Sequence, residues 1–427
     1  MVNQIYFFSK SICGIIKYAK LGDVLKMNVL KKIYCRIFQK VMHLAIPLLP
    51  YREPKLLDDI TNVIDILKEK NIDSVMLVTG KRIKASGLTL PLEQLLHENN
   101  ILCTIYDNTL PNPTSNNVYE AKKLYLENNC KGIIAFGGGS VMDCAKAMGA
   151  LIVKPKMNLE KMAGLIKVRK KLPCLIAIPT TAGSGSEVTV ASVIVDSNTH
   201  HKYVINDFSL IPHYALMMPS ATITLPQHIT AITGMDALTH AVEAYIGKSK
   251  TRKTKKASEE AVKLIFDNLE KAYLNGADLV ARKNMLHASY LAGVAFTRSY
   301  VGYVHALSHP LGGKYGVAHG LANAVLLPHV LRAYGDSVTK SLSKLSVMLG
   351  LVDEGASKEE ARDAFILHIE QMNKRMGIPT KLECVNKDDI PYLANLADKE
   401  ANPLYPVPTL WNAKELEKIY LLIRSEK

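Results

Sequence analysis

The sequence predicts an α/β domain built on a parallel sheet, followed by an all-helical domain. Between about residues 54 and 225, short apolar runs alternate with amphipathic segments of helical period. This alternation is typical of a parallel sheet covered by helices on both faces. Past Pro226, apolar runs of strand length cease, and segments of helical period continue almost to the C-terminus. We therefore expect a Rossmann-like domain over 54–225 and a helical domain over 226–427.

The predicted elements follow in order along the chain. In the first domain, helical periods cover 58–70, 88–100 and 116–129, and each is followed by an apolar strand, at 74–79, 101–106 and 132–136. Shorter strands are expected after Pro179, at 192–196 and 201–207. In the second domain, helices are expected over 228–247, 256–276 and 280–300.

Residues 1–53 form a basic extension before these domains. Its first fifty residues carry eight Lys or Arg side chains against one acid, Asp23. Lys10 and Lys17 interrupt the apolar residues at the very N-terminus, and no clean cleavage site follows, so a signal peptide is not expected. We expect a helical appendage that can touch a membrane surface or a partner subunit.

Composition restricts the class of protein further. With 427 residues and 48% hydrophobic content, the chain can bury a large core. Its seven cysteines are scattered without a CxxC pair, which favours reduced thiols and a cytoplasmic protein. The formal charge of +14 gathers in runs such as 167–171 and 248–256 that are typical of solvated loops, and no nucleic-acid motif accompanies them. No uncharged apolar run reaches transmembrane length, so stable membrane insertion is not expected.

Two glycine- and hydroxyl-rich turns follow predicted strands. Residues 137–140 (GGGS) lie between an apolar strand and a helix, where backbone N–H groups can face a phosphate. Alone, this turn is equally well an ordinary strand-to-helix connection, because it is not GxGxxG. Residues 179–187 (PTTAGSGSE) make a second such turn. Two turns of this kind after parallel strands favour a dinucleotide at the carboxyl edge of the sheet.

A set of acidic and imidazole side chains in the second half predicts a metal site. Asp236 and His240 are four residues apart in a helical segment and therefore share a face. His305 and His319 supply two more imidazoles from a later segment. One carboxylate and three imidazoles suit Fe(II) or Zn(II), although each His alone would more often be a core or capped residue.

His309 has the same four-residue spacing from His305. Pro310, Gly312 and Gly313 follow it and are expected to end this helix before His319.

These motifs together resemble the iron-containing (group III) alcohol dehydrogenase family, which includes lactaldehyde reductase and butanol dehydrogenases. The resemblance covers roughly 54–427 and is carried by 137–147, 178–189, 233–245, 304–330 and 402–408. It implies a dehydroquinate synthase-like architecture with a nicotinamide cofactor, NAD(H) or NADP(H), between the two domains. It also implies a cytoplasmic homodimer.

The resemblance assigns roles to individual residues. Asp236, His240, His305 and His319 match the family's metal ligands, and His309 matches a His thought to relay protons. Asp143 is expected near the nicotinamide or behind the GGGS turn. The remaining cofactor contacts are expected at Asn112, Gly137, Gly138, Gly139, Ser140, Thr180, Thr181, Ser184 and Lys202. The helix faces of 240–245 and 294–303 should line the pocket.

One departure from the family bears on cofactor choice. Many members carry an acid after the first strand, but this chain has Gly80, Lys81 and Arg82 there. Losing a carboxylate and adding cations suits a 2′-phosphate, so we expect NADP(H) to be favoured. The alternative is a simple basic surface turn.

The implied activity is hydride transfer between a nicotinamide cofactor and a small primary alcohol or aldehyde, with the metal as Lewis acid. A dehydroquinate synthase-like or polyol dehydrogenase relative, which also combines NAD with a metal, is the nearest alternative. A membrane-associated, non-catalytic binding protein on a dehydrogenase scaffold is the alternative from another class.

Overall fold

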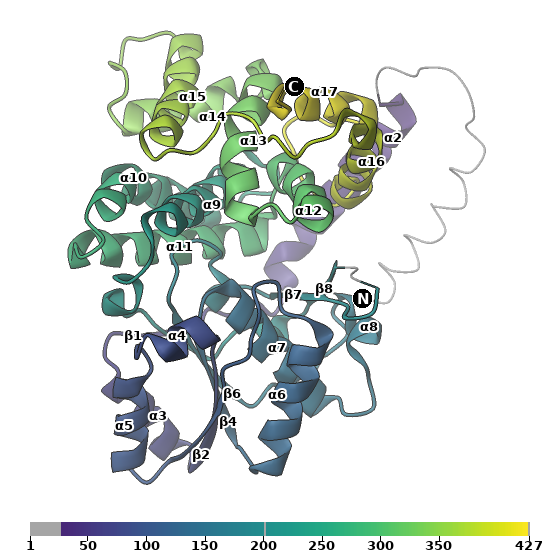
Figure 1. The fold of residues 1–427 in the computed structure, drawn as a ribbon. Coiled ribbons are helices and arrows are strands. Elements are labelled where there is room, and N and C mark those ends of the chain that lie inside the picture. The colour runs from purple at the N-terminus through teal and green to yellow at the C-terminus, as the bar shows by residue number, and fades with distance from the viewer. Residues whose placement is uncertain (1–26, 200–201, 426–427) are drawn as a thin grey trace.

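The computed structural model describes residues 27–199 and 202–425. An α/β domain and a helical domain are stacked on one another (Figure 1). The proposed boundary near residue 225 falls in the connection between the last strand, β9 (Tyr214–Leu216), and the first long helix, α9 (Gln227–Ile246).

The α/β domain is built on a six-stranded, fully parallel sheet in the order β1-β9-β6-β4-β2-β3. Its other strands are β1 (Lys55–Leu57), β2 (Ser74–Val78), β3 (Leu102–Tyr106), β4 (Gly132–Gly137) and β6 (Cys174–Pro179). Every residue of β2 and β4 is buried, as their unbroken apolar sequences predict. The predicted parallel sheet is confirmed.

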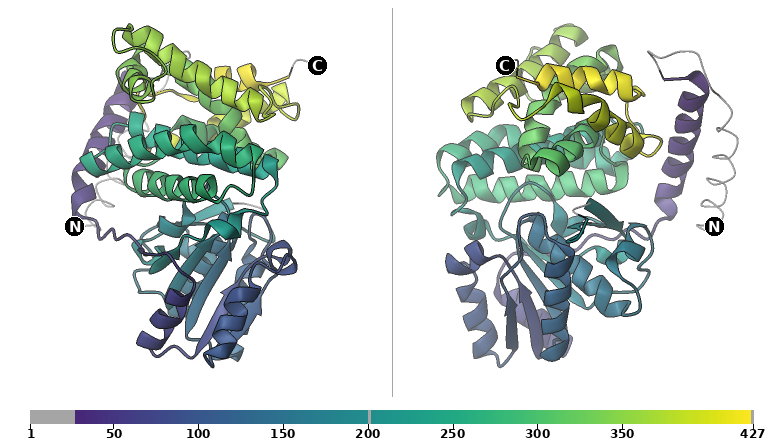
Figure 2. Two further views of the ribbon diagram at one scale, coloured as in Figure 1. Left: turned by 90° about the vertical axis from the view of Figure 1, so that its left-hand side faces the viewer. Right: turned by 45° about the vertical axis from the view of Figure 1, so that its right-hand side comes forward.

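Helices cover both faces of this sheet (Figure 2). They are α3 (Thr61–Glu69), α5 (Leu90–Glu98), α6 (Ser115–Glu127) and α7 (Gly139–Val153). The short helix α4 (Lys81–Ala85) follows the end of β2, and α8 (Leu159–Met162) lies beside a second, smaller sheet. Alternate residues of each strand enter two separate cores: Met76 and Ile133 pack with α6 and α7, whereas Val75 and Ile134 pack with α3 and α5.

The shorter predicted strands form a sheet of their own. β7 (Ala191–Val195) and β8 (Lys202–Asn206) pair antiparallel, and β5 (Gly164–Leu165) adds parallel to β8. Short 3-10 turns lie before β7 at η3 (Ser186–Val188), after β8 at η4 (Phe208–Leu210) and after β9 at η5 (Pro219–Thr222).

The remainder of the described chain is helical. Its elements after α9 are α10 (Arg252–Leu274), α11 (Leu279–Ser299), α12 (Tyr303–Tyr315), α13 (His319–Tyr334), α14 (Asp336–Met348), α15 (Lys358–Arg375), η6 (Lys387–Asp389), α16 (Ile390–Ala401) and α17 (Ala413–Ile423). α9 is buried continuously from Gly234 to Ile246 and lies at the centre of the largest core. Gly320 lets α13 approach it closely, because a Cβ there would lie 2.2 Å from the carbonyl oxygen of Ile232.

The helix ends before His319, as predicted, but the expectation that Pro310, Gly312 and Gly313 end it is wrong. α12 continues through them to Tyr315, and Gly316 then ends it in the left-handed region at φ 69°. Pro310 has no N–H to donate to the carbonyl of Ala306, so packing must hold the helix together here. Both Pro310 and Leu311 are buried, and the hydroxyl of Tyr420 donates to the neighbouring carbonyl of Leu307 at 2.7 Å.

The N-terminal appendage contains the helix α2 (Val29–Ala45) and the turn η2 (Ile46–Leu48), which lie against the helical domain (Figure 2). Residues 1–26, which include the remainder of the predicted extension, lie outside the described residues. None of the described helices has the length and apolar content that crossing a lipid bilayer requires.

Candidate metal and cofactor site

Four side chains from three helices converge on one point in the helical domain. Asp236 and His240 come from α9, His305 from α12 and His319 from the first turn of α13. One ligand atom from each lies within 4.8 Å of the others. From Oδ1 of Asp236, the distances are 3.4 Å to Nε2 of His319 and 4.0 Å each to Nε2 of His305 and Nδ1 of His240. Asp236, His240 and His305 are buried, and only His319 is partly exposed.

The chemistry of these four groups fits a divalent cation. Nδ1 of His240 is buried without a hydrogen-bond partner in the described part of the chain. Burial lowers the pKa of His305 well below its ordinary value and that of His319 to about 4, so both imidazoles are neutral and keep a lone pair. One oxygen and three neutral nitrogens suit Fe(II) or Zn(II) better than Mg²⁺ or Ca²⁺.

A buried carboxylate that the sequence analysis missed orients one ligand. Glu243 accepts from Nδ1 of His305 at 2.6 Å and from the backbone N–H groups of Gly302 and Val304 at 2.8 and 2.7 Å. Burial raises its pKa to about 8, and the backbone N–H groups of Gly302, Val304 and His305 oppose that shift. Because its Nδ1 is held in this way, His305 presents Nε2 to the other ligands. The signal in the sequence was weak: an acid three residues after His240.

Asn323 is a second missed residue and lies among the ligand atoms. Its Nδ2 is 2.7 Å from Oδ1 of Asp236, 3.1 Å from Nε2 of His319 and 3.3 Å from Nε2 of His305. It is one helical turn after His319 on α13 and fully buried. The ring of Phe296 completes the surroundings by stacking on His240, with centroids 4.1 Å apart.

His309 lies beside this cluster rather than within it. Its ring stacks on that of His319 with centroids 5.2 Å apart. Its Nδ1 is 2.7 Å from Oε1 of Glu400, which also accepts from the hydroxyl of Tyr405 at 2.7 Å. Burial lowers the pKa of His309, but the Glu400 carboxylate more than offsets this, so the net shift is upward. Sequence reasoning found His309 and missed both Glu400 and Tyr405.

The two predicted turns of the α/β domain face each other at the carboxyl edge of the sheet. A Cβ on Gly138 would lie 3.2 Å from Oγ1 of Thr181, and one on Gly139 would lie 2.9 Å from Oγ of Ser184. The N–H of Thr180 donates to the carbonyl of Gly137 at 3.1 Å. Glycine at these positions therefore leaves room for the Thr181 and Ser184 side chains of the facing turn.

Other predicted cofactor residues gather beside these turns. Nζ of Lys202 donates to Oδ1 of Asn112 at 2.8 Å, and the N–H of Asn112 donates to Oγ of Ser140 at 3.3 Å. Asp143, which is partly buried near the start of α7, accepts from Oγ of Ser186 at 3.3 Å, and loss of contact with water raises its pKa to about 6. The fully buried Lys146, which the sequence analysis did not single out, also donates to Oγ of Ser186, at 3.0 Å.

Gly80, Lys81 and Arg82 lie at the same edge, where β2 ends and α4 begins. Gly80 pairs through an isolated bridge with Asn108 and has a φ of −116°, which any residue can adopt. Both cations are exposed. The structure thus brings the basic turn to the cofactor edge without giving its side chains a role.

A cavity of about 570 Å³ joins the two regions. The four candidate ligands, His309 and Glu400 line it, as do Gly139, Asp143 and Ser184 from the cofactor edge. Of the two helix faces expected to line it, 294–303 contributes Phe296, Thr297, Arg298, Tyr300 and Val301, but 240–245 contributes only His240. The rest of that face is buried in helix packing; Tyr245, for example, donates to Glu259.

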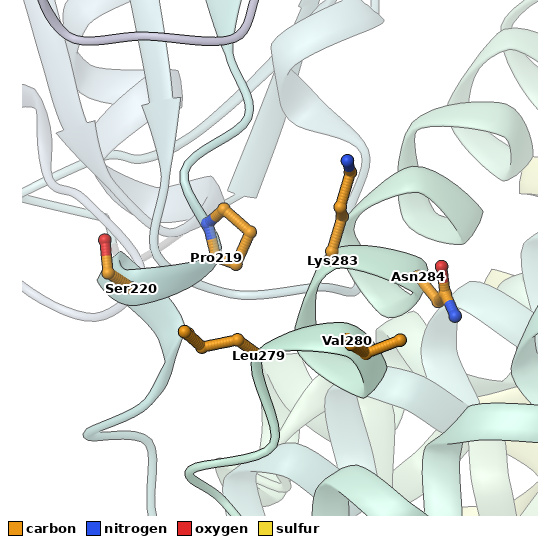
Figure 3. A pocket seen from close by; sticks show the side chains of 6 residues that line it. All are labelled: Pro219, Ser220, Leu279, Val280, Lys283 and Asn284. Carbon is orange, nitrogen blue, oxygen red and sulfur yellow. The ribbon is translucent and has the colours of Figure 1, made fainter.

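A second hollow lies elsewhere, between η5 and the start of α11 (Figure 3). Its lining residues are Pro219, Ser220, Leu279, Val280, Lys283 and Asn284. None of them is a predicted site residue, so this hollow adds nothing to the metal and cofactor site.

Comparison with known families agrees with this geometry. The model for "Iron-containing alcohol dehydrogenase" matches residues 57–219, and that for "Fe-containing alcohol dehydrogenase family, C-terminal" matches 230–423. The chain is 37% identical to a 1,3-propanediol dehydrogenase of Citrobacter freundii over 349 residues, 81% of this chain and 90% of that protein. It is 34% identical to the lactaldehyde reductase of Escherichia coli (strain K12), over 78% of this chain and 87% of the enzyme.

Solved structures extend the likeness to the whole fold. A crystal structure of 1,3-propanediol oxidoreductase superposes with a TM-score of 0.83 at 35% identity, covering 87% of this chain and 98% of that one. A sulfoacetaldehyde reductase from Bifidobacterium kashiwanohense in complex with NAD+ superposes with a TM-score of 0.78 at 27% identity, covering 87% and 98%. The protein therefore belongs to the iron-containing alcohol dehydrogenase family, whose members are metal- and nicotinamide-dependent oxidoreductases of alcohols and aldehydes.

Proposed function

We propose that the protein interconverts a small primary alcohol and its aldehyde, with Fe(II) or Zn(II) as the metal and NADP(H) as the favoured cofactor. One observation carries this proposal: the Asp236, His240, His305 and His319 cluster opens into a cavity that reaches the N-terminus of α7. A substrate at the cluster and a nicotinamide at that helix would therefore share one space.

Each group has a task in this reaction. Asp236 and the three ligand imidazoles would hold the metal, which when bound acts as a Lewis acid toward the substrate oxygen, while the nicotinamide carries the hydride. Glu243 fixes the orientation of His305. His309 is occupied by Glu400 at Nδ1, which leaves Nε2 to take the alcohol proton during oxidation and return it during reduction.

The preference for NADP(H) rests on the basic turn. Lys81 and Arg82 are exposed beside the cofactor edge, and the carboxylate that would repel a 2′-phosphate is replaced by Gly80. The relative solved with NAD+ supports nicotinamide binding by this fold in general. The cofactor contacts proposed above at Asn112, at Gly137 to Ser140, at Thr180 to Ser184 and at Lys202 are common to both cofactors.

The proposal is tested by following NADPH and NADH oxidation with a series of aldehydes, with metal analysis of the same purified sample. We expect turnover with NADPH and about one Fe or Zn per chain. Absence of turnover with every aldehyde, in a sample with full metal content, would overturn it. Tight, non-dissociating NAD and activity on a phosphorylated sugar or a polyol would instead favour the dehydroquinate synthase-like or polyol dehydrogenase alternative.

Three further expectations belong to this proposal. We propose a homodimer, by analogy with the family, and a cytoplasmic location, which is supported by the free thiols of the six described cysteines.

We also propose that α2 touches anionic membranes. Its outward face exposes Leu30, Ile37 and Leu44 by 67%, 58% and 66%, and the helix contains four Lys or Arg and no acid.

Membrane contact is tested by co-sedimentation with phosphatidylserine-containing vesicles, in parallel with the activity assay. Binding that Ile37→Glu abolishes would support it. Binding by a catalytically inactive protein would favour the alternative of a non-catalytic, membrane-associated scaffold.

A further inference from the structure

Part of the cavity wall comes from a segment that precedes the family match. The matched ranges begin at residue 57, yet Met42, Ile46, Leu49 and Tyr51 line the same cavity as the candidate metal ligands. Met42 belongs to the last turn of α2, and Ile46 opens η2. At spacings of four and three residues, Met42, Ile46 and Leu49 follow one face of this segment.

Hydrogen bonds to a loop of the helical domain fix α2 in this position. Gln39, which is buried, donates through Nε2 to the carbonyls of Tyr405 at 2.7 Å and Pro403 at 3.1 Å. Arg36 donates to the carbonyls of Val407 at 2.7 Å and Pro408 at 2.9 Å. The loop that α2 holds also supplies Leu404 and Tyr405 to the cavity. Helix and loop therefore form one wall of the cavity.

Tyr51 secures the other end of this wall. Its hydroxyl donates to the carbonyl of Val188 at 3.3 Å, and the guanidinium of Arg298 lies 3.9 Å from its ring centroid. The chain between α2 and β1 is thus attached both to η3 of the α/β domain and to α11 of the helical domain.

The wall that these elements build is apolar. Met42, Ile46 and Leu49 carry no charge, and the helical domain adds the apolar residues Val301 and Leu404 to the lining of the same cavity. The small sheet and the η4 turn contribute Leu165, Val204 and Phe208 to the same cavity. A polar substrate tail would lose its hydrogen bonds to water at this wall without gaining new ones, which is unfavourable. Burying a hydrocarbon chain against the same wall is favourable.

We propose that α2 and η2 form a subsite for the hydrocarbon chain of the substrate, which makes the substrate class unbranched, medium-chain primary alcohols and aldehydes. This inference rests on the proposed function and deepens it. Each methylene group that enters an apolar wall improves binding by about fourfold. Hexanal has four more methylene groups than acetaldehyde, so their kcat/KM values should differ by on the order of 10².

The test measures kcat/KM for linear aldehydes from acetaldehyde to octanal with the full-length holoenzyme. We expect kcat/KM to rise with chain length, and Met42→Gln to lower the hexanal-to-acetaldehyde ratio by about tenfold. Ile46→Phe should narrow the wall and move the best substrate to a shorter chain. Leu44→Gln is the matched control, because Leu44 belongs to the same helix turn but is 66% exposed on its outer side. It should leave the ratio unchanged.

Binding provides a readout that does not depend on turnover. Calorimetric titration of the holoenzyme with 1-hexanol should give a negative heat-capacity change that Met42→Gln reduces. An active enzyme whose kcat/KM is independent of chain length, or variants that change only the KM for the nicotinamide cofactor, would overturn this inference while leaving the proposed function intact. An enzyme inactive with all these aldehydes would overturn the proposed function itself.

Discussion

The two halves of the site are built in opposite ways. In the helical domain, four ligand atoms from three helices meet within 4.8 Å, and three of the four residues are buried. In the α/β domain, the candidate cofactor residues are spread from Gly80 to Lys202 along the edge of a sheet, and only Gly139, Asp143 and Ser184 reach the shared cavity.

This difference follows from the two ligands. A cation is a point charge and requires a few convergent donors whose orientation is fixed by a surrounding shell. A dinucleotide is long and is held through many modest contacts, mostly to backbone groups at turns. We therefore expect single substitutions at the metal centre to abolish function and those at the sheet edge to change it by degrees.

The largest effect is expected from His305→Ala. It removes a ligand and leaves the buried Glu243 carboxylate without its imidazole partner, so bound metal and turnover should both be lost. Metal content measured by mass spectrometry alongside activity checks this. His287→Ala, a substitution of a half-exposed His on α11, should change neither. A His305→Ala protein that still holds one metal per chain would show that the ligand set is assigned wrongly.

His309→Ala should separate proton transfer from metal binding. The variant should keep its metal but lose roughly 10²- to 10⁴-fold in kcat for alcohol oxidation. Since Glu400 raises the pKa of His309 against the opposing effect of burial, the wild-type oxidation rate should rise with pH through a value above the ordinary one for His, as the ring becomes neutral. The variant should lack this rise. If it loses metal as completely as His305→Ala does, His309 is a ligand and not a relay.

Glu243→Gln tests whether a residue that orients a ligand contributes to metal affinity. The amide keeps the shape of the side chain, but its NH₂ group faces the N–H donors of Gly302, Val304 or His305. Metal affinity, measured by competition with a chelator, should fall by about 10- to 100-fold. Glu370→Gln, at a partly exposed ion pair with Arg332, is the control and should leave affinity unchanged. If Glu243→Gln leaves the metal affinity unchanged, Glu243 does not contribute to metal binding, and the four ligands alone determine the affinity.

At the sheet edge, we expect a change in cofactor preference rather than a loss of function. Gly80→Asp should shift the ratio of kcat/KM for NADPH over NADH by roughly ten- to a hundredfold toward NADH, because the carboxylate can accept from a ribose hydroxyl and repels a 2′-phosphate. The backbone allows it: a Cβ would lie 3.5 Å from the carbonyl of Thr109, an ordinary contact. Lys123→Ala on α6 controls for general loss of charge. If the wild-type protein already prefers NADH, Lys81 and Arg82 are ordinary surface residues that do not bind a 2′-phosphate.

Local sequence patterns predicted the fold class of this protein and several residues of its candidate site. The alternation of apolar and amphipathic segments predicted the parallel sheet and the switch to helices, because burial imposes one period on a strand and another on a helix. The four-residue spacing of Asp236 and His240 placed both on one face of α9. The motifs and their order showed the resemblance to the family, and that resemblance identified His309 and all four candidate metal ligands.

What the sequence left open depends on contacts between distant segments. Glu243 lies 62 residues from His305 and Glu400 lies 91 residues from His309, and no local spacing predicts that either pair will meet. Pro310 predicted the end of a helix that packing against neighbouring helices carries on to Tyr315. The sequence of the appendage predicted only a basic amphipathic helix. Its position on the cavity depends on hydrogen bonds from Arg36 and Gln39 to backbone carbonyls in a loop some 370 residues away. The tertiary structure decided these matters because a buried polar group is stable only beside a partner, and folding alone determines which partner is near.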